Sequence, residues 1–171
     1  MNREQLFREA IQESGRRIFQ ICRHFFGPGD DAHDAYQEIL LKVWLNLDAF
    51  RGEAQMKTWI HRIAVNVCLT FAAQAKRNSS IFVPFTQSDN GENLSENEGE
   101  SEEAGMKLRF FQTFMQKLSA ADRTLVSLYL ENLDTAEMAQ TTGLSEANVR
   151  VKIHRIKKQI QQEWEVHHGT R

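Results

Sequence analysis

The sequence predicts an all-α protein, built as two small helical domains joined by a flexible acidic linker. Apolar residues recur at three- and four-residue steps over most of the 171 residues. Only residues 79–85, SSIFVPF, have the composition of a strand, and Pro84 interrupts them. Residues 86–105 hold seven of the 23 acidic residues and no Lys or Arg. Such a polar, self-repelling stretch is typical of an extended linker.

The amino-acid composition narrows the possible classes of protein. Hydrophobic residues make up 41% and charged residues 26%, as in ordinary globular proteins. No apolar run approaches the ~18 residues of a membrane span, and the N-terminus is charged from Arg3 onward and lacks an apolar signal core. We therefore expect a cytoplasmic protein. Cys22 and Cys68 lack metal-ligand spacing and lie among apolar residues, so we expect buried free thiols, and no metal or cofactor.

The charge is unevenly distributed. The formal net charge is −2, which by itself argues against a nucleic-acid-binding protein. However, the acidic stretch at 86–105 accounts for seven acids, so the rest of the chain holds all 21 basic residues and only 16 acidic ones. The acidic stretch therefore masks a mildly basic remainder, and DNA remains a candidate partner.

The first domain is expected over residues 1–78, with three helices at 2–26, 32–49 and about 55–76. The sequence GPGDD at 27–31 breaks the first helix, and its Asp residues can cap the second. Short connections between three helices predict one compact bundle. The apolar faces of the second and third helices are expected to contain Tyr36, Ile39, Leu40, Val43, Trp44, Leu47, Ile60, Ile63, Ala64, Val67 and Phe71.

The second domain is expected over 106–171, after a linker at 79–105. Helices are predicted at 107–118, 119–132, 134–143 and 144–164. Ser119, Asp134 and Ser145 stand where N-caps belong, and Gly143 supplies the positive φ that ends a helix and makes a turn. The order of a short helix, this turn and a longer helix is typical of a helix-turn-helix motif.

The last helix has a buried stripe and a basic outer face. Val149, Ile153, Ile156 and Ile160 recur at steps of four, three and four. A helix fits the DNA major groove, where cations reach phosphates or base acceptors. The alternative is a solvated charged face on an ordinary bundle helix. The remaining faces carry Arg150, Lys152, His154, Arg155, Lys157 and Lys158.

Two motifs in the chain occur in a fixed order. The first, within 31–66, consists of Asp31, Ala32, Asp34, Gln37, Glu38, Trp44, Phe50, Arg51, Gly52, Glu53, Thr58, Trp59, Arg62, Ile63, Ala64 and Asn66. The second is LSAADRTLVSLYL at 118–130, ahead of the helix-turn-helix. The first motif resembles region 2 of the sigma-70 family, and more narrowly its extracytoplasmic-function (ECF, group IV) sigma factors, and the second domain resembles region 4. The resemblance implies an alternative transcription initiation factor that binds core RNA polymerase and directs it to promoters.

The resemblance also implies three sites. Core polymerase would dock on Asp34, Gln37, Glu38 and Leu41, of which the first three share a helix face. The melted −10 strand would meet Arg51, Glu53, Lys57, Thr58, Trp59, His61, Arg62 and Asn66. Single-strand binding needs cations and flat surfaces for bases, and Trp59 either stacks on a base or lies at the edge of the core. The −35 duplex would meet Ser145, Asn148, Arg150, Val151, Lys152, His154, Arg155 and Lys158.

The chain departs from the family pattern in both domains. Thr70 stands where the family usually has Asp, and Ala73 and Gln74 stand at basic positions. In the recognition helix, Val151 replaces a frequent small polar residue, so it can touch a thymine methyl but cannot hydrogen-bond. We therefore expect atypical promoter preferences.

Other classes of function fit less well. An enzyme is disfavoured because no phosphate loop or nucleophile motif is present, and the adjacent His33 and Asp34 face apart on a helix. A helix-turn-helix repressor that binds DNA without polymerase is the main alternative. A third interpretation is a protein that only sequesters a partner. The resemblance implies core RNA polymerase, promoter DNA and an anti-sigma factor, often membrane-anchored, as partners, and no small-molecule substrate.

Overall fold

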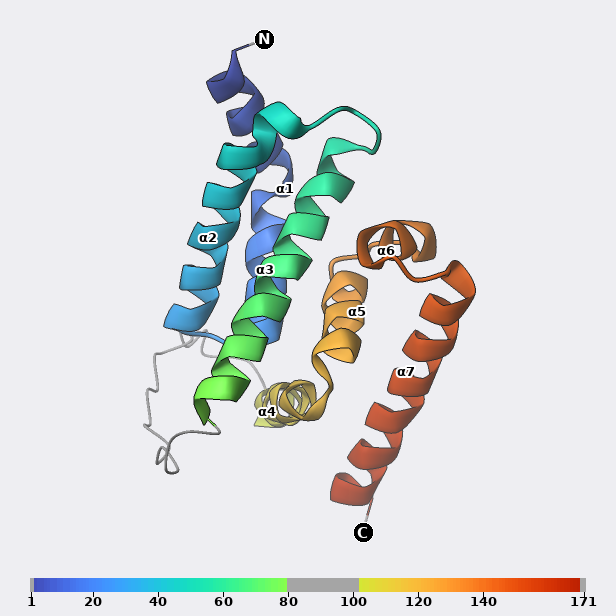
Figure 1. Cartoon of the computed structure of the whole chain (residues 1–171). Helices are drawn as coiled ribbons and strands as arrows, with labels where there is room; N and C mark the ends of the chain where they lie inside the picture. The colour runs from blue at the N-terminus through green and yellow to red at the C-terminus, as the bar shows by residue number, and fades with distance from the viewer. Residues whose placement is uncertain (1, 80–101, 170–171) are drawn as a thin grey trace.

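The structure is a computed structural model that describes residues 2–79 and 102–169 (Figure 1). Over these residues it contains helices and no strand, which confirms the all-α prediction. The strand-like segment SSIFVPF lies outside the described residues except for Ser79. The helices are α1 (Arg3–Phe26), α2 (Asp30–Asn46), the 3-10 helix η1 (Leu47–Ala49), α3 (Met56–Ser79), α4 (Glu102–Lys117), α5 (Ala120–Leu130), α6 (Thr135–Thr142) and α7 (Glu146–His168).

Helices α1, α2 and α3 form the expected three-helix bundle. Their periodic apolar residues face one another, and Ile18, Ile39 and Ile60 are fully buried at its centre. Cys22 of α1 and Cys68 of α3 are free and buried, as predicted. A hydrogen bond with the Cys22 thiol, together with burial, raises the pKa of Cys68, so the Cys68 thiol remains an uncharged packing group.

The start of α2 differs from the expectation. The helix begins at Asp30, earlier than predicted, and its N-cap is Gly29, which provides no side-chain cap hydrogen bond. Asp30 and Asp31 lie in the first turn instead of capping it. There they stabilise the helix through its dipole, because carboxylates are favourable near a helix N-terminus.

The predicted caps of the second domain are confirmed. Ser119 Oγ accepts from the Asp122 backbone N–H at 3.1 Å, and Ser145 Oγ accepts from the Asn148 N–H at 3.2 Å. Gly143 ends α6 with φ of 77°. At the start of α6, Asp134 and Glu137 form a reciprocal capping box. Helix α4 begins at Glu102, ahead of the predicted start near residue 107.

The two halves of the chain pack against each other. Figure 1 shows α5 and α6 lying between α3 and α7. One apolar cluster runs from the bundle into the second half, where it includes Leu125, Leu128 and Met138. Buried apolar surface thus joins the helix-turn-helix to α1 and α3.

A single arginine reinforces this junction. Arg123 of α5 donates from Nε to the Met115 carbonyl at 2.9 Å and from Nη1 to the Phe25 carbonyl at 3.2 Å. Its Nη2 reaches the carbonyls of Gln116 and Leu118 at 3.0 and 3.3 Å. One guanidinium therefore satisfies carbonyl groups at the C-terminal ends of both α4 and α1, which helices leave unpaired.

Candidate polymerase and promoter interface

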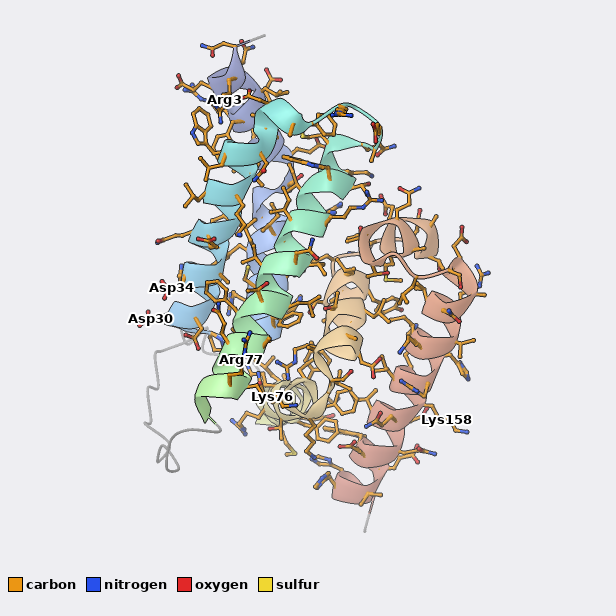
Figure 2. The ribbon with its side chains drawn as sticks, in the orientation of Figure 1. Arg3, Asp30, Asp34, Lys76, Arg77 and Lys158 are labelled. Carbon is orange, nitrogen blue, oxygen red and sulfur yellow. The ribbon has the colours of Figure 1, made fainter. Side chains whose placement is uncertain are left out.

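The outer face of α2 carries the residues expected to dock on polymerase. Asp34 and Gln37 are exposed, and Figure 2 shows Asp34 pointing away from the bundle. Glu38 is partly covered and pairs with Lys42 at 3.5 Å. Leu41 is 50% exposed, although it is a large apolar side chain. The structure therefore brings the four predicted residues onto one accessible surface that mixes acids with an apolar group.

Sequence reasoning missed one member of this surface. Leu45 is 61% exposed and follows Leu41 by four residues, so the two lie on the same side of α2. Exposed apolar side chains that adjoin one another mark protein interaction sites. The signal was present in the sequence, because Leu45 stands outside the buried stripe of Ile39 and Val43.

The loop before α3 and the first turn of α3 divide into open and buried positions. Arg51 and Glu53 are exposed around Gly52, whose φ of 73° makes the turn. Thr58 is buried, so its side chain is inaccessible in this conformation. Trp59 is half-buried, packs on the core and lies 5.4 Å from the Phe50 ring, centroid to centroid. Its contact with the core supports the structural alternative, while its partial exposure leaves part of the indole free.

Two cations of α3, Lys57 and Arg62, contact α6, and Arg62 is also exposed to solvent. Lys57 Nζ lies 2.6 Å from Glu137 Oε1. Arg62 Nε donates to the Gln140 backbone carbonyl at 2.7 Å. Asn66, about two and a half turns from Lys57, is exposed. Of the predicted −10 residues, therefore, Lys57 and Arg62 are engaged by the other half of the molecule and Asn66 is not buried.

His61 lies between these two contacts and is only 3% exposed. Its Nε2 is buried and has no hydrogen-bond partner among the described residues. Burial lowers the pKa of His61 to about 4, with Arg17 and Lys57 adding to the effect and Glu137 opposing it. The imidazole is therefore neutral near pH 7 and, in this conformation, cannot serve as a phosphate-binding cation.

Helix α7 presents its predicted residues outward. Ser145 and Asn148 form the capped N-terminus, and Val151 is 67% exposed. Figure 2 shows Lys158 projecting away from the rest of the molecule. The other exposed members of the set are Arg150, His154 and Arg155, whereas Lys152 is partly covered.

Acidic residues hold several of these cations in place. Asp122 of α5 accepts from Lys152 Nζ at 3.3 Å and from Arg155 Nη2 at 3.2 Å. Glu146 pairs with Arg150 one turn away, at 3.3 Å. Asp122 lies in the first turn of α5, and its contact with α7 could not be predicted from the sequence because it depends on how α5 and α7 pack.

Two further observations bear on the kind of site. Among the described residues, no group of three or more His, Cys, Asp or Glu side chains is arranged to hold a metal ion. Within the same ranges, none of the helices combines the length and apolar character needed to cross a membrane.

Comparison with known proteins identifies the family. The model for sigma-70 region 2 matches residues 10–78, and the model for sigma-70 region 4 matches residues 111–160. Together with full-length relatives of the same kind, these matches place the chain in the sigma-70 family, among the ECF RNA polymerase sigma factors.

Individual relatives differ in how much they share. The ECF sigma factor SigG of Mycobacterium tuberculosis is 42% identical over 55 residues, which are 32% of this chain and only 15% of SigG. The ECF sigma-E factor of Escherichia coli K12 is 28% identical over 176 residues, covering 92% of each chain. The crystallised sigma factor RpoE of Bartonella quintana, bound to the anti-sigma factor NepR, covers 94% of this chain and 97% of its own. It matches with a TM-score of 0.72 at 17% identity, a likeness of fold.

Proposed function

We propose that this protein is an alternative transcription initiation factor that binds core RNA polymerase and directs it to specific promoters. The proposal rests on two surfaces that occur in the same chain. Helix α2 has an exposed face with acidic and apolar side chains, and α7, the second helix of the helix-turn-helix, has basic side chains that point outward. The first surface suits a protein partner and the second suits duplex DNA. Both lie in segments that match the corresponding sigma regions.

The proposed division of labour follows the chain. Residues 1–78 bind polymerase through Asp34, Gln37, Glu38 and Leu41 and capture the melted −10 strand. Residues 79–105 link the domains, and residues 106–171 read the −35 duplex. Arg51, Glu53, Lys57, Thr58, Trp59, His61, Arg62 and Asn66 form the −10 set, and Ser145, Asn148, Arg150, Val151, Lys152, His154, Arg155 and Lys158 form the −35 set.

Further parts of the proposal concern setting and partners. The protein acts in the cytoplasm, and polymerase performs the catalysis, so the protein itself is not an enzyme. An anti-sigma factor holds it when it is not needed. The complex of the similar Bartonella quintana sigma factor with NepR supports that proposal by fold and by the partner it contains.

The test is transcription by core RNA polymerase from a promoter library, with and without the protein. Transcripts that require the protein, and that share two sequence motifs at a fixed spacing, are the expected result. Specific binding to duplex DNA as a dimer without polymerase, together with no transcripts when polymerase is added, would instead identify a repressor. Absence of both activities would favour a protein that only sequesters a partner.

A variant pair tests the α2 surface in the same assay. Leu41→Glu places a charge in the exposed apolar patch, and we expect it to reduce transcript yield by about tenfold or more, as for a central interface residue. Val166→Glu is the matched control, because Val166 is 76% exposed at the far end of α7. Equal yields from the two variants would contradict the assignment of α2 as the polymerase-binding face.

A further inference from the structure

The last turn of α7 places an imidazole against a thioether of α4. His168 Nε2 lies 3.1 Å from Met106 Sδ, although the two residues are 62 positions apart in the chain. The other ring nitrogen, Nδ1, lies 3.3 Å from the backbone carbonyl oxygen of Trp164. No local spacing in the sequence indicates this contact, and neither residue belongs to the proposed polymerase or promoter surfaces. The two side chains are called the His168–Met106 pair below.

The contacts of the ring determine which nitrogen can bind an ion. A carbonyl oxygen only accepts, so the hydrogen bond to Trp164 requires the proton on Nδ1 of His168. In a neutral ring Nε2 then carries a lone pair, and the sulfur of Met106 also offers lone pairs and no proton. A cation bound by both atoms satisfies the contact. Histidines that bind metals commonly donate their other N–H to a backbone carbonyl in this way.

Aromatic packing restricts the orientation of the imidazole. The rings of His168 and Trp164 are stacked, with centroids 3.8 Å apart and an interplanar angle of 17°. Trp164 in turn packs edge-on against Phe110 of α4, at 5.0 Å between centroids. The pair is nevertheless accessible, because His168 is exposed and Met106 is 38% exposed. An ion can therefore reach two donor atoms that the surrounding side chains already hold together.

The donor atoms and the nearby charges favour one kind of ion. Thioethers select soft ions and imidazoles suit copper, so Cu(I) matches both donors. Donor atoms ~2.0–2.3 Å from one ion can lie about 3 Å apart, as Nε2 and Sδ do here. The cavity of about 350 Å³ beside the pair is also lined by Arg109 and Lys117, whose repulsion is weaker for a monovalent ion than for a divalent one.

Zinc fits this site poorly. A structural zinc ion takes four protein ligands, mostly Cys and His. Within residues 2–79 and 102–169, no group of three or more His, Cys, Asp or Glu side chains is arranged to hold a metal ion. The pair therefore suits an ion that accepts few ligands and a thioether among them.

We propose that the His168–Met106 pair binds a soft monovalent metal ion, of the class of Cu(I) and Ag(I), and that the bound ion ties the end of α7 to α4. Binding forms one nitrogen–metal bond and one sulfur–metal bond and releases water from the ion, and no electron is transferred. The site is separate from the proposed function, since it uses none of the residues assigned to polymerase or promoter DNA.

The test is a titration of the full-length protein, labelled with ¹³C at its methionine methyl groups, with silver nitrate in chloride-free buffer. Two-dimensional NMR resolves the methyl signals of the five methionines, and Met106→Leu identifies the signal of Met106 by its loss. We expect this signal to shift and to saturate near one equivalent of Ag(I) at about 0.1 mM protein, which corresponds to a Kd of about 10 µM or below. The signals of the buried Met115 and Met138 should stay unchanged.

His168→Gln tests the imidazole. It removes the ring at an exposed position, and we expect the affinity for Ag(I), followed at the Met106 methyl group, to fall about tenfold or more. The matched control is His154→Gln, the same substitution at another exposed imidazole of α7, which should change the affinity by less than about twofold. Because both positions are exposed, both variants should fold as the wild type does.

Two outcomes would overturn the site. If Ag(I) is bound while the Met106 methyl signal does not move, the ion lies elsewhere, for example at the buried thiols of Cys22 and Cys68. If the signal moves equally in the wild type and in His168→Gln, the thioether acts alone and the two side chains do not form a site. Either result leaves the proposed role in transcription as it stands, because that role is tested by transcription with polymerase.

Discussion

The two helices that we propose to contact DNA, α3 and α7, carry similar cations but differ in the residues that bind those cations. On α3, Lys57 and Arg62 are bound by residues of α6, which belongs to the other half of the chain. On α7, Lys152 and Arg155 are bound by Asp122 of the same half, and the side chains still face outward. The contacts with α6 cover part of the α3 surface, whereas the contacts with Asp122 hold the α7 side chains in an outward orientation. An acidic partner can therefore either close a nucleic-acid site or organise it, depending on the element that supplies it.

The largest effect is expected from a substitution that weakens the packing between the two halves of the chain. Arg123→Ala removes hydrogen bonds to Met115, Gln116, Leu118 and Phe25 carbonyls at the junction of α1, α4 and α5. Because it leaves several helix-end carbonyls unsatisfied, we expect it to lower the free energy of unfolding by about 3 kcal/mol. Urea unfolding followed by circular dichroism measures this. Arg123→Lys keeps the positive charge but lacks the several N–H donors of the guanidinium, so it should restore only part of the lost stability. Full recovery would contradict the role assigned to these hydrogen bonds.

Low pH should lower the free energy of unfolding through His61 on α3, and should have no such effect through the exposed His154 on α7. The pKa of His61 is about 4 in the folded protein against about 6.5 when exposed, so the folded state disfavours its protonation. The contribution of neutral His61 is therefore fully present above about pH 6.5 and is lost as the pH falls toward 4. At pH 5 the loss should be about 2 kcal/mol.

The measurement is the free energy of unfolding as a function of pH for two variants. His61→Gln should flatten the decline between pH 7 and pH 5, and His154→Gln, an exposed imidazole on α7, should leave it unchanged. Arg17, Lys57 and Glu137 are the charged groups around His61, and both variants retain them. Parallel pH curves for the two variants would show that His61 is not buried in solution as it is here.

The sequence predicted the local features well and the long-range ones poorly. The helices, the caps at Ser119 and Ser145 and the turn at Gly143 follow from residue type and period, so they could be read directly. The Lys57–Glu137 pair could not, because it joins residues 80 positions apart and depends on how two helical units dock. Glu137 likewise lies near His61, although no carboxylate stands three or four residues from His61 in the sequence.

A smaller change should sharpen the role assigned to α7. Asp122→Asn releases Lys152 and Arg155 from their carboxylate without altering the backbone cap at Ser119. Because the partner charge is lost, non-specific affinity for duplex DNA should rise by about twofold while discrimination among −35 sequences falls. Fluorescence anisotropy with polymerase holoenzyme and matched or scrambled duplexes measures both. Glu163→Gln is the control, because Glu163 pairs with Lys117 of α4 and the substitution makes the same change in net charge. An unchanged ratio of specific to non-specific binding would argue against an orienting role for Asp122.

The smallest effect on stability is expected at Val151. Its side chain is largely exposed, so Val151→Ser should change the free energy of unfolding by less than about 0.5 kcal/mol. The same substitution removes the methyl groups available to a thymine and adds a hydroxyl, so the preferred −35 sequence should shift. Selection of promoters from the library by wild-type and variant holoenzymes reports the shift. Identical preferences would place Val151 outside the base-reading surface.

The distance between α3 and α6 tests the central claim most directly. Spin labels at Gln74→Cys on α3 and Gln140→Cys on α6 occupy exposed positions, and the native cysteines are buried. The free protein should give one short, narrow distance distribution by pulsed electron paramagnetic resonance. The complex with core polymerase and promoter DNA should give a longer one. An unchanged short distance in a complex that initiates transcription would contradict the proposed binding of the −10 strand by Lys57 and Arg62, because α6 would still occupy both side chains.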